Sequence, residues 1–299
     1  MADLSLTAAL CAALNDTPLQ LPVHSAVARR AAGLLSAGRP QATELAALAA
    51  TDPVLASSLL RAANGAFYAG LPRISSLEEA LCRIGCAVAG QVVASACREG
   101  KRAAGGRFSA SYLEPLWQHS LGCALGAAWL ARRCGYPGLV DLAHLAGLLH
   151  DFGKWLLLAG LGRLAGDGHA GGNLGDRLIE EVLASLHVEL GLRLATEWHL
   201  PAEVAGVIGG HHETELDGQQ PLLALVRLAN LGCRKLGLGW ARDPDLVLPT
   251  TAEAQMLSLD ELAMAEFEIM LEDRFQLVSP CPPSATVGNL TNVHTGSNV

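Results

Sequence analysis

A histidine and an aspartate, His150 and Asp151, stand side by side at the end of an apolar stretch that begins at Leu145 and is followed by Gly153. A carboxylate buried beside an imidazole is unfavourable unless a partner compensates its charge. A divalent cation is such a partner, because imidazole nitrogen and carboxylate oxygen are ligands of Fe, Mn, Zn or Mg ions. The pair therefore predicts a site for one or two divalent metal ions. A buried hydrogen bond between the two side chains is the alternative.

Further histidines lie on both sides of this pair. His119 precedes it, His187 follows a glycine-rich loop, and His211 and His212 are adjacent. A single histidine in a helix is more often solvated than a ligand, and an adjacent pair can simply end a helix, where the dipole favours positive charge. The ordered series outweighs this reading, because its members fall on separate expected helices. The candidate metal ligands are therefore His119, His150, Asp151, His187, His211 and His212.

The elements that carry these residues are expected to be α-helices, which makes the fold class all-α. Apolar residues recur with a period near 3.6 along most of the chain, and alternating β-branched runs are absent. Hydrophobic residues make up 51% of the chain but aromatic ones only 4%, a composition that suits close-packed helices. Asp52 followed by Pro53 predicts a helix start, and Gly85, Gly100 and Gly135 are expected helix ends.

Composition and charge exclude several classes of partner. The net charge of −8 and the lack of clustered Lys and Arg disfavour direct nucleic-acid binding. The eight cysteines lie mostly in apolar helical patterns, which points to a reducing compartment. Residues 139–161 are apolar but interrupted by charged and histidine side chains, so they do not predict a membrane span. We expect a cytoplasmic protein that does not bind a membrane.

Several segments, in order, resemble the HDOD family of bacterial signalling proteins, within the HD superfamily of metal-dependent phosphohydrolases. The histidine series is similar to the HD pattern and, in its longer form, to the HD-GYP branch, which hydrolyses cyclic dinucleotides. The HDOD-like segments are residues 51–55 (TDPVL), 59–68 (LLRAANGAFY), 74–80 (ISSLEEA), 117–120 (WQHS), 150–154 (HDFGK), 187–191 (HVELG) and 198–201 (WHLP). The resemblance covers roughly residues 18–235, most of the chain.

The resemblance implies an N-terminal helical bundle followed by an HD-type helical bundle. The expected units are residues 1–100, a linker at 101–108, the HD-like bundle at 109–240, a helical extension at 241–278 that packs back or self-associates, and a disordered tail at 279–299.

Two departures from the HD and HD-GYP patterns bear on activity. The last acidic ligand falls where this chain has Asn230, whose neutral amide should weaken the binding of a hard dication. The Gly-Tyr-Pro motif of the HD-GYP branch is missing after Lys154. The same letters at 135–137 precede His150 and are interpreted as a turn.

The resemblance implies a regulatory module of HDOD type, which acts by binding a signalling protein or a nucleotide signal rather than by catalysis. A homodimer and a cyclic nucleotide or other phosphate ligand fit this expectation. The alternative is a metal-dependent phosphohydrolase, in which Lys154 is a candidate phosphate contact unless it lies on the helix surface. A third interpretation is a helical scaffold whose histidines only form hydrogen bonds.

Overall fold

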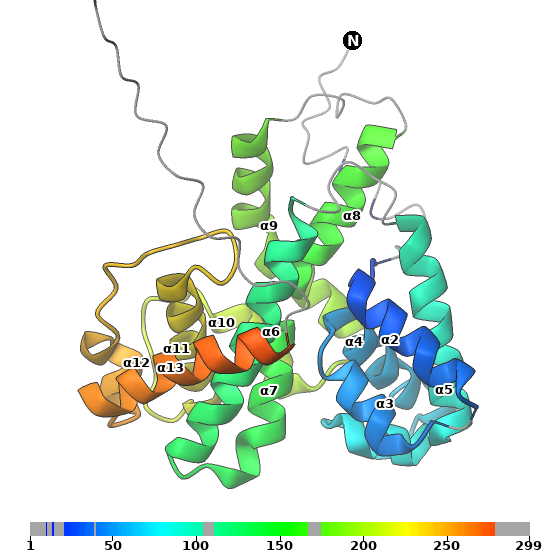
Figure 1. Ribbon diagram of the computed structural model, residues 1–299, viewed down its shortest axis with the longest axis horizontal. Helices are drawn as coiled ribbons and strands as arrows, with labels where there is room; N and C mark the ends of the chain where they lie inside the picture. Colours follow the sequence, from blue (N-terminus) through cyan, green and yellow to red (C-terminus); the bar gives the residue numbers. More distant parts are fainter. Residues whose placement is uncertain are drawn as a thin grey trace, which may run out of the picture.

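The structure is a computed structural model of the 299-residue chain. It describes Leu10, Leu14 and residues 21–38, 40–103, 111–166 and 175–278. Every regular element in these residues is a helix and none is a strand, so the predicted all-α class is confirmed (Figure 1). The tail expected at 279–299 lies outside the described residues. The division at 101–108 stays a prediction, because residues 104–110 lie outside them too.

In the part of the chain that the structure describes, four α-helices form the N-terminal bundle, drawn in blue to cyan in Figure 1. They are α2 (Ser25–Ser36), α3 (Ala42–Ala49), α4 (Pro53–Ala63) and α5 (Leu77–Ala103). The other three pack against α5. The predicted start at Asp52 is confirmed, since its carboxylate accepts hydrogen bonds from the backbone N–H groups of Val54 and Leu55 and Pro53 is the first helical residue.

Two glycines of α5 were expected to end helices, and the structure bears out one of them. Gly85, with φ +74° and ψ 156°, is non-helical and separates two helices that meet at a kink, so the helix end expected there is confirmed. The second of these helices continues past Gly100 to Ala103. The stop predicted at Gly100 is therefore wrong. By length and a mean hydropathy of 1.5, residues Leu77–Glu99 resemble a membrane-spanning helix, yet they pack on α2, α3 and α4 as part of the bundle.

The second bundle is centred on α6, which packs between α7 and α11. Its helices are α6 (Leu113–Arg133), α7 (Val140–Leu149), α8 (Phe152–Gly166), α9 (Asp176–Glu197), α10 (Ala202–Gly210) and α11 (Pro221–Leu236). The C-terminal extension adds α12 (Ala252–Met256) and α13 (Glu261–Val278). Helix α13 lies across α6 and α11 with Phe267 and Leu271 buried, so it packs back on the body of the molecule.

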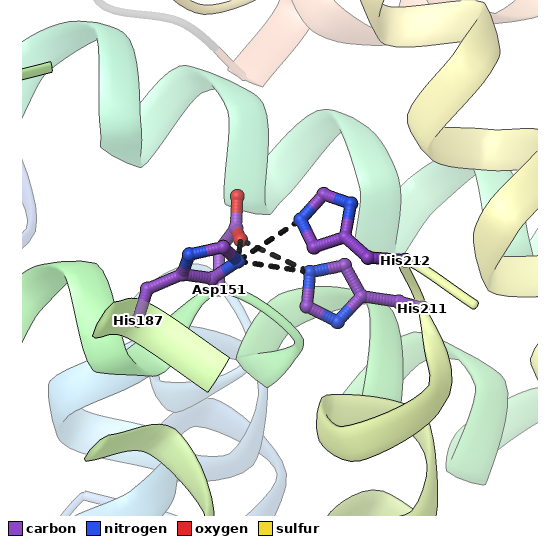
Figure 2. A group of neighbouring side chains, drawn as sticks. All are labelled: Asp151, His187, His211 and His212. Atoms are coloured by element: carbon purple, nitrogen blue, oxygen red, sulfur yellow. Dashed lines mark hydrogen bonds and ion pairs between the residues drawn. The ribbon is translucent and has the colours of Figure 1, made fainter. Parts of the chain in front are cut away.

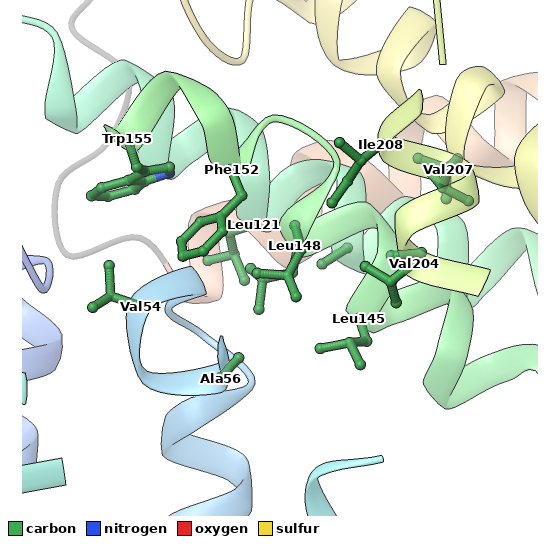
Figure 3. Packing of buried hydrophobic residues seen from close by; sticks show 14 of the residues in the cluster. Val54, Ala56, Leu121, Leu145, Leu148, Phe152, Trp155, Val204, Val207 and Ile208 are labelled. Carbon is green, nitrogen blue, oxygen red and sulfur yellow. The ribbon is translucent and has the colours of Figure 1, made fainter. Parts of the chain in front are cut away.

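The two bundles share one apolar core. Val54 and Ala56 of α4 lie beside Leu148, Phe152 and Trp155 of the second bundle (Figure 3). Hydrogen bonds also cross the boundary between the two bundles. The indole of Trp117 donates to the carbonyl of Thr51 at 2.8 Å, and Nε2 of His144 lies 2.9 Å from the carbonyl oxygen of Ala50. The N-terminal bundle thus supports the helices that carry the histidine series.

Candidate metal centre

The structure brings the candidate ligands from four parts of the second bundle together around Asp151. Asp151 and His150 lie between α7 and α8, His119 on α6, His187 on α9, and His211 with His212 after α10. Nε2 of His187 and Nε2 of His211 each lie 3.5 Å from Oδ1 of Asp151 (Figure 2). We call the six residues the histidine–aspartate cluster: His119, His150, Asp151, His187, His211 and His212.

Each carboxylate oxygen of Asp151 faces a different set of imidazoles. His187, His211 and His212 form the Oδ1 side, where Nε2 of His212 lies 3.0 Å from Nε2 of His187. His119 and His150 form the Oδ2 side, with their Nε2 atoms 3.5 and 3.4 Å from Oδ2. All members except His212, which is exposed, are buried or nearly so.

The backbone fixes the orientation of four of the imidazoles. Their Nδ1 atoms lie 2.7–3.0 Å from the carbonyl oxygens of Leu238, Gly147, Leu183 and Ile208, for His119, His150, His187 and His211 respectively. A carbonyl only accepts, so each Nδ1 carries the proton, and Nε2 of a neutral ring then presents a lone pair. These tautomers follow from the hydrogen-bond network. The same outer partner is typical of histidines that bind metal through the opposite nitrogen.

The cluster is consequently short of hydrogen-bond donors. Nε2 of His187 lies 3.3 Å from Nε2 of His211, where neutral rings place lone pair against lone pair. Among the described residues, Nε2 of His150 and Oδ1 of Asp151 are buried without a hydrogen-bond partner. Lys154 supplies one positive charge, with Nζ 2.6 Å from Oδ2 of Asp151. Buried acceptors left in this state are costly, and a cation on each side of the carboxylate would satisfy them.

Protonation of the rings does not remove this shortage. Burial lowers the pKa of His119, His150 and His187, and burial together with His211 and His187 lowers the pKa of His212 to about 4. Burial alone would raise the pKa of Asp151. The neighbouring Lys154, His150 and His211 outweigh that effect and hold it well below its usual range. These shifts favour an ionised carboxylate and neutral rings at His119, His150, His187 and His212, which is the state that binds a metal ion.

The spacing of the donors fits metal coordination. A tetrahedral ion bound at zinc-like distances separates neighbouring nitrogen and oxygen ligands by about 3.4 Å. The nitrogen–oxygen distances of the cluster, 3.4–3.5 Å, match this value and exceed good hydrogen bonds. Because the two carboxylate oxygens face different imidazoles, the donor set fits one or two ions.

Two glycines allow the helices to approach closely enough to build the cluster. A Cβ at Gly147 of α7 would lie 2.6 Å from the backbone oxygen of Cys123 on α6. A Cβ at Gly153 of α8 would overlap the backbone oxygen of His187 on α9. These contacts hold His150 and Asp151 between α6 and α9, so larger side chains at either position would separate the ligands.

Lys154 and Asn230 take different positions. Lys154 is not a surface lysine, because it pairs with Asp151 and only 18% of its side chain is exposed. Asn230 lies on α11, half-buried, and in the part of the chain that the structure describes it makes no hydrogen bond to the cluster.

The sequence interpretation missed Cys123, whose Sγ lies 3.6 Å from Nε2 of His119. The signal was its position four residues after His119, which places both on one helix face.

Comparisons with known proteins bear on the family and the fold of the chain. The family profile described as HDOD domain matches residues 21–214. The MmoQ response regulator of Methylococcus capsulatus has a similar fold, with a TM-score of 0.66, 24% identity and coverage of 85% of this chain and 99% of that one. A virulence factor of Campylobacter jejuni gives a TM-score of 0.56 at 14% identity, covering 90% and 98%.

A shorter likeness connects the chain to a nuclease. Ribonuclease Y of Latilactobacillus sakei is 36% identical over 105 residues, which are 35% of this chain. The chain spans only 15% of the length of that relative.

Proposed function

This chain belongs to the HDOD domain family, and we propose that it is a signal-transduction module that holds one or two divalent cations in the histidine–aspartate cluster and acts by binding a partner. One observation carries the proposal. The Nε2 lone pairs of His119, His150, His187 and His211 converge on an ionised, buried carboxylate without enough donors to satisfy them.

The ligand sets follow from the two sides of Asp151. His187, His211 and His212 with Oδ1 would hold one ion, and His119 and His150 with Oδ2 would hold another. Bound cations at this place would supply positive charge that attracts the phosphate group of a nucleotide or of a phosphorylated partner. Lys154 lies next to them and adds a point charge that can contact a phosphate oxygen.

The charge balance favours regulation over turnover. The cluster contains one carboxylate, and Asn230 replaces the acidic residue expected from the HD pattern with a neutral amide. Hard ions such as Mg²⁺ bind best where several carboxylates meet, whereas imidazole-rich sets suit Zn, Fe and Ni. The fold likeness to MmoQ, a response regulator, supports a role in signalling.

A metal-dependent phosphohydrolase is the second candidate, because His212 is exposed and gives the Oδ1 side access to solvent. The similarity to Ribonuclease Y supports phosphodiester chemistry for the matched segment. The net charge of −8 argues against RNA as the ligand of this chain.

Elemental analysis combined with thermal melting tests the proposal. Purified protein should carry between one and two equivalents of a transition metal, and refilling chelated protein with zinc should raise the melting temperature by about 5 °C or more. The proposal would be overturned if the purified protein carried no metal and its melting temperature did not change on addition of zinc, iron(II) or manganese. Turnover of cyclic dinucleotides by loaded protein, lost in His211→Asn, would favour the second candidate.

A further inference from the structure

Cys123 lies where the Oδ2 side of the cluster lacks a ligand. It occupies α6 one turn after His119, and its side chain is fully buried. Its Sγ, Nε2 of His119 and a ring nitrogen of His150 lie within 4.8 Å of one another. Oδ2 of Asp151 lies 3.5 Å from Nε2 of His119 and 3.4 Å from Nε2 of His150, so it is a candidate fourth donor beside these three.

The separations agree with those around a tetrahedral zinc ion. With Zn–S near 2.3 Å and Zn–N near 2.0 Å, a sulfur and a nitrogen ligand lie about 3.5 Å apart. The distance from Sγ of Cys123 to Nε2 of His119 is 3.6 Å. In the metal-free protein a thiol can donate a weak hydrogen bond to this nitrogen, and a cation would take the place of that proton.

We infer that Cys123 is a metal ligand and that, with His119, His150 and Asp151, it forms a sulfur-containing site selective for zinc, iron(II) or cobalt(II) over magnesium and manganese. This inference rests on the proposed function, because it requires the cluster to hold cations. Binding releases the thiol proton to solvent, and the thiolate brings a second negative charge beside Asp151. That charge adds to the single carboxylate of the cluster, and soft sulfur accounts for the selectivity.

The surrounding helices hold the sulfur in place. Cys123, Cys233 of α11 and Leu238 form a small buried cluster, and the Leu238 carbonyl also orients the ring of His119. A Cβ at Gly122 would lie 2.8 Å from Sγ of Cys233, so only glycine lets α11 approach this closely. Cys233 packs against Cys123 but is not among the three grouped donors His119, Cys123 and His150, so we assign it a supporting role rather than that of a ligand.

Cobalt(II) titration of the full-length, reduced protein tests the inference without an activity assay. Wild-type protein should develop the near-ultraviolet charge-transfer band of a cobalt–thiolate bond. Cys123→Ser should lose this band while keeping cobalt bound on the Oδ1 side, and Cys233→Ser, the matched control in the same buried cluster, should keep the band. Zinc X-ray absorption of the wild type should show sulfur at about 2.3 Å.

Zinc affinity at this site should fall by more than about 100-fold in Cys123→Ser, since losing a ligand exceeds the loss of an outer partner. Circular dichroism and melting of the metal-free variants, with Cys123→Ala as a second substitution, show that each is folded. Bound cobalt without a sulfur band overturns this inference alone, and so does a band that survives Cys123→Ser but not Cys233→Ser. No bound cobalt at all overturns the proposed metal centre as well.

Discussion

Two buried aspartates, one in each bundle, differ in how their charge is accommodated. Asp52 accepts backbone N–H bonds at 2.9–3.0 Å from His24, Val54 and Leu55. Asp151, equally buried, is surrounded by imidazole lone pairs, and Lys154 is its one cationic partner among the described residues. Backbone N–H groups satisfy the carboxylate of Asp52. Oδ1 of Asp151 has no hydrogen-bond donor among the described residues, so this carboxylate would need a cation from outside the chain.

The pKa values of the two groups shift in opposite directions. Burial raises the pKa of Asp52 to about 6 despite its hydrogen bonds. Burial also acts on Asp151, but Lys154 and the nearby histidines outweigh it and keep its pKa low. A buried polar group is therefore not by itself a sign of function. The informative feature is the balance of donors and acceptors around it.

Asp52→Ala should cause the largest loss of stability, because it removes a helix cap and leaves three buried N–H groups without acceptors. We expect the free energy of unfolding to fall by about 4 kcal/mol in urea denaturation of chelated protein. Asp52→Asn, which keeps one acceptor oxygen, is the control and should lose less. A loss below about 1 kcal/mol would show that this carboxylate is not structural.

Asp151→Ala should affect zinc binding more than the stability of the metal-free protein. It should abolish the stabilisation by zinc, about 3 kcal/mol at a concentration 100 times the Kd, while changing metal-free stability less than Asp52→Ala does. Thermal melting with and without zinc measures both effects. If the variant kept the full zinc-induced rise in melting temperature, the contrast between the two aspartates would fail.

In the metal-free protein, the contribution of Asp52 to stability and that of the cluster histidines should change with pH in opposite directions. The pKa of Asp52 is raised from 3.8 to about 6 in the folded state, so its contribution is full below pH 3.8 and is lost as pH rises to 6, by on the order of 3 kcal/mol. The cluster histidines have lowered pKa values, so their contribution is lost as pH falls below 6.5. Urea titrations of Asp52→Asn should therefore show stability rising more steeply with pH than in wild type. Equal slopes would contradict this.

Gly153→Ala should weaken both the fold and the metal site, because its Cβ would overlap the backbone oxygen of His187. A loss of about 2 kcal/mol in unfolding free energy and weaker zinc binding are expected. Gly206 on α10 is the matched control, since a Cβ there meets nothing within 4 Å, and Gly206→Ala should stabilise by about 0.5 kcal/mol. Unchanged zinc affinity in Gly153→Ala would mean that this helix contact does not position His187.

Local chemistry in the sequence predicted much of the fold. The helical period and the Asp52–Pro53 start are local features, and the structure has both. The stop at Gly100 failed because α5 packs on α3 and α4, and tertiary contacts override a weak preference of one glycine.

The candidate site was predictable in residue type but not in geometry. The distances around Asp151 depend on the close helix contacts at Gly147 and Gly153, which spacing along the chain does not reveal. Cys123 was missed because a cysteine in an apolar helix is typically a small core residue, and its neighbour His150 comes from the turn between α7 and α8.

Diffraction from crystals grown with zinc, measured at the zinc absorption edge, shows directly whether cations bind in the histidine–aspartate cluster. We expect an anomalous peak between Oδ1 of Asp151 and the Nε2 atoms of His187 and His211, with a second between Oδ2, His119 and His150. The absence of any peak there, with the rings turned to donate hydrogen bonds to Asp151, would contradict it.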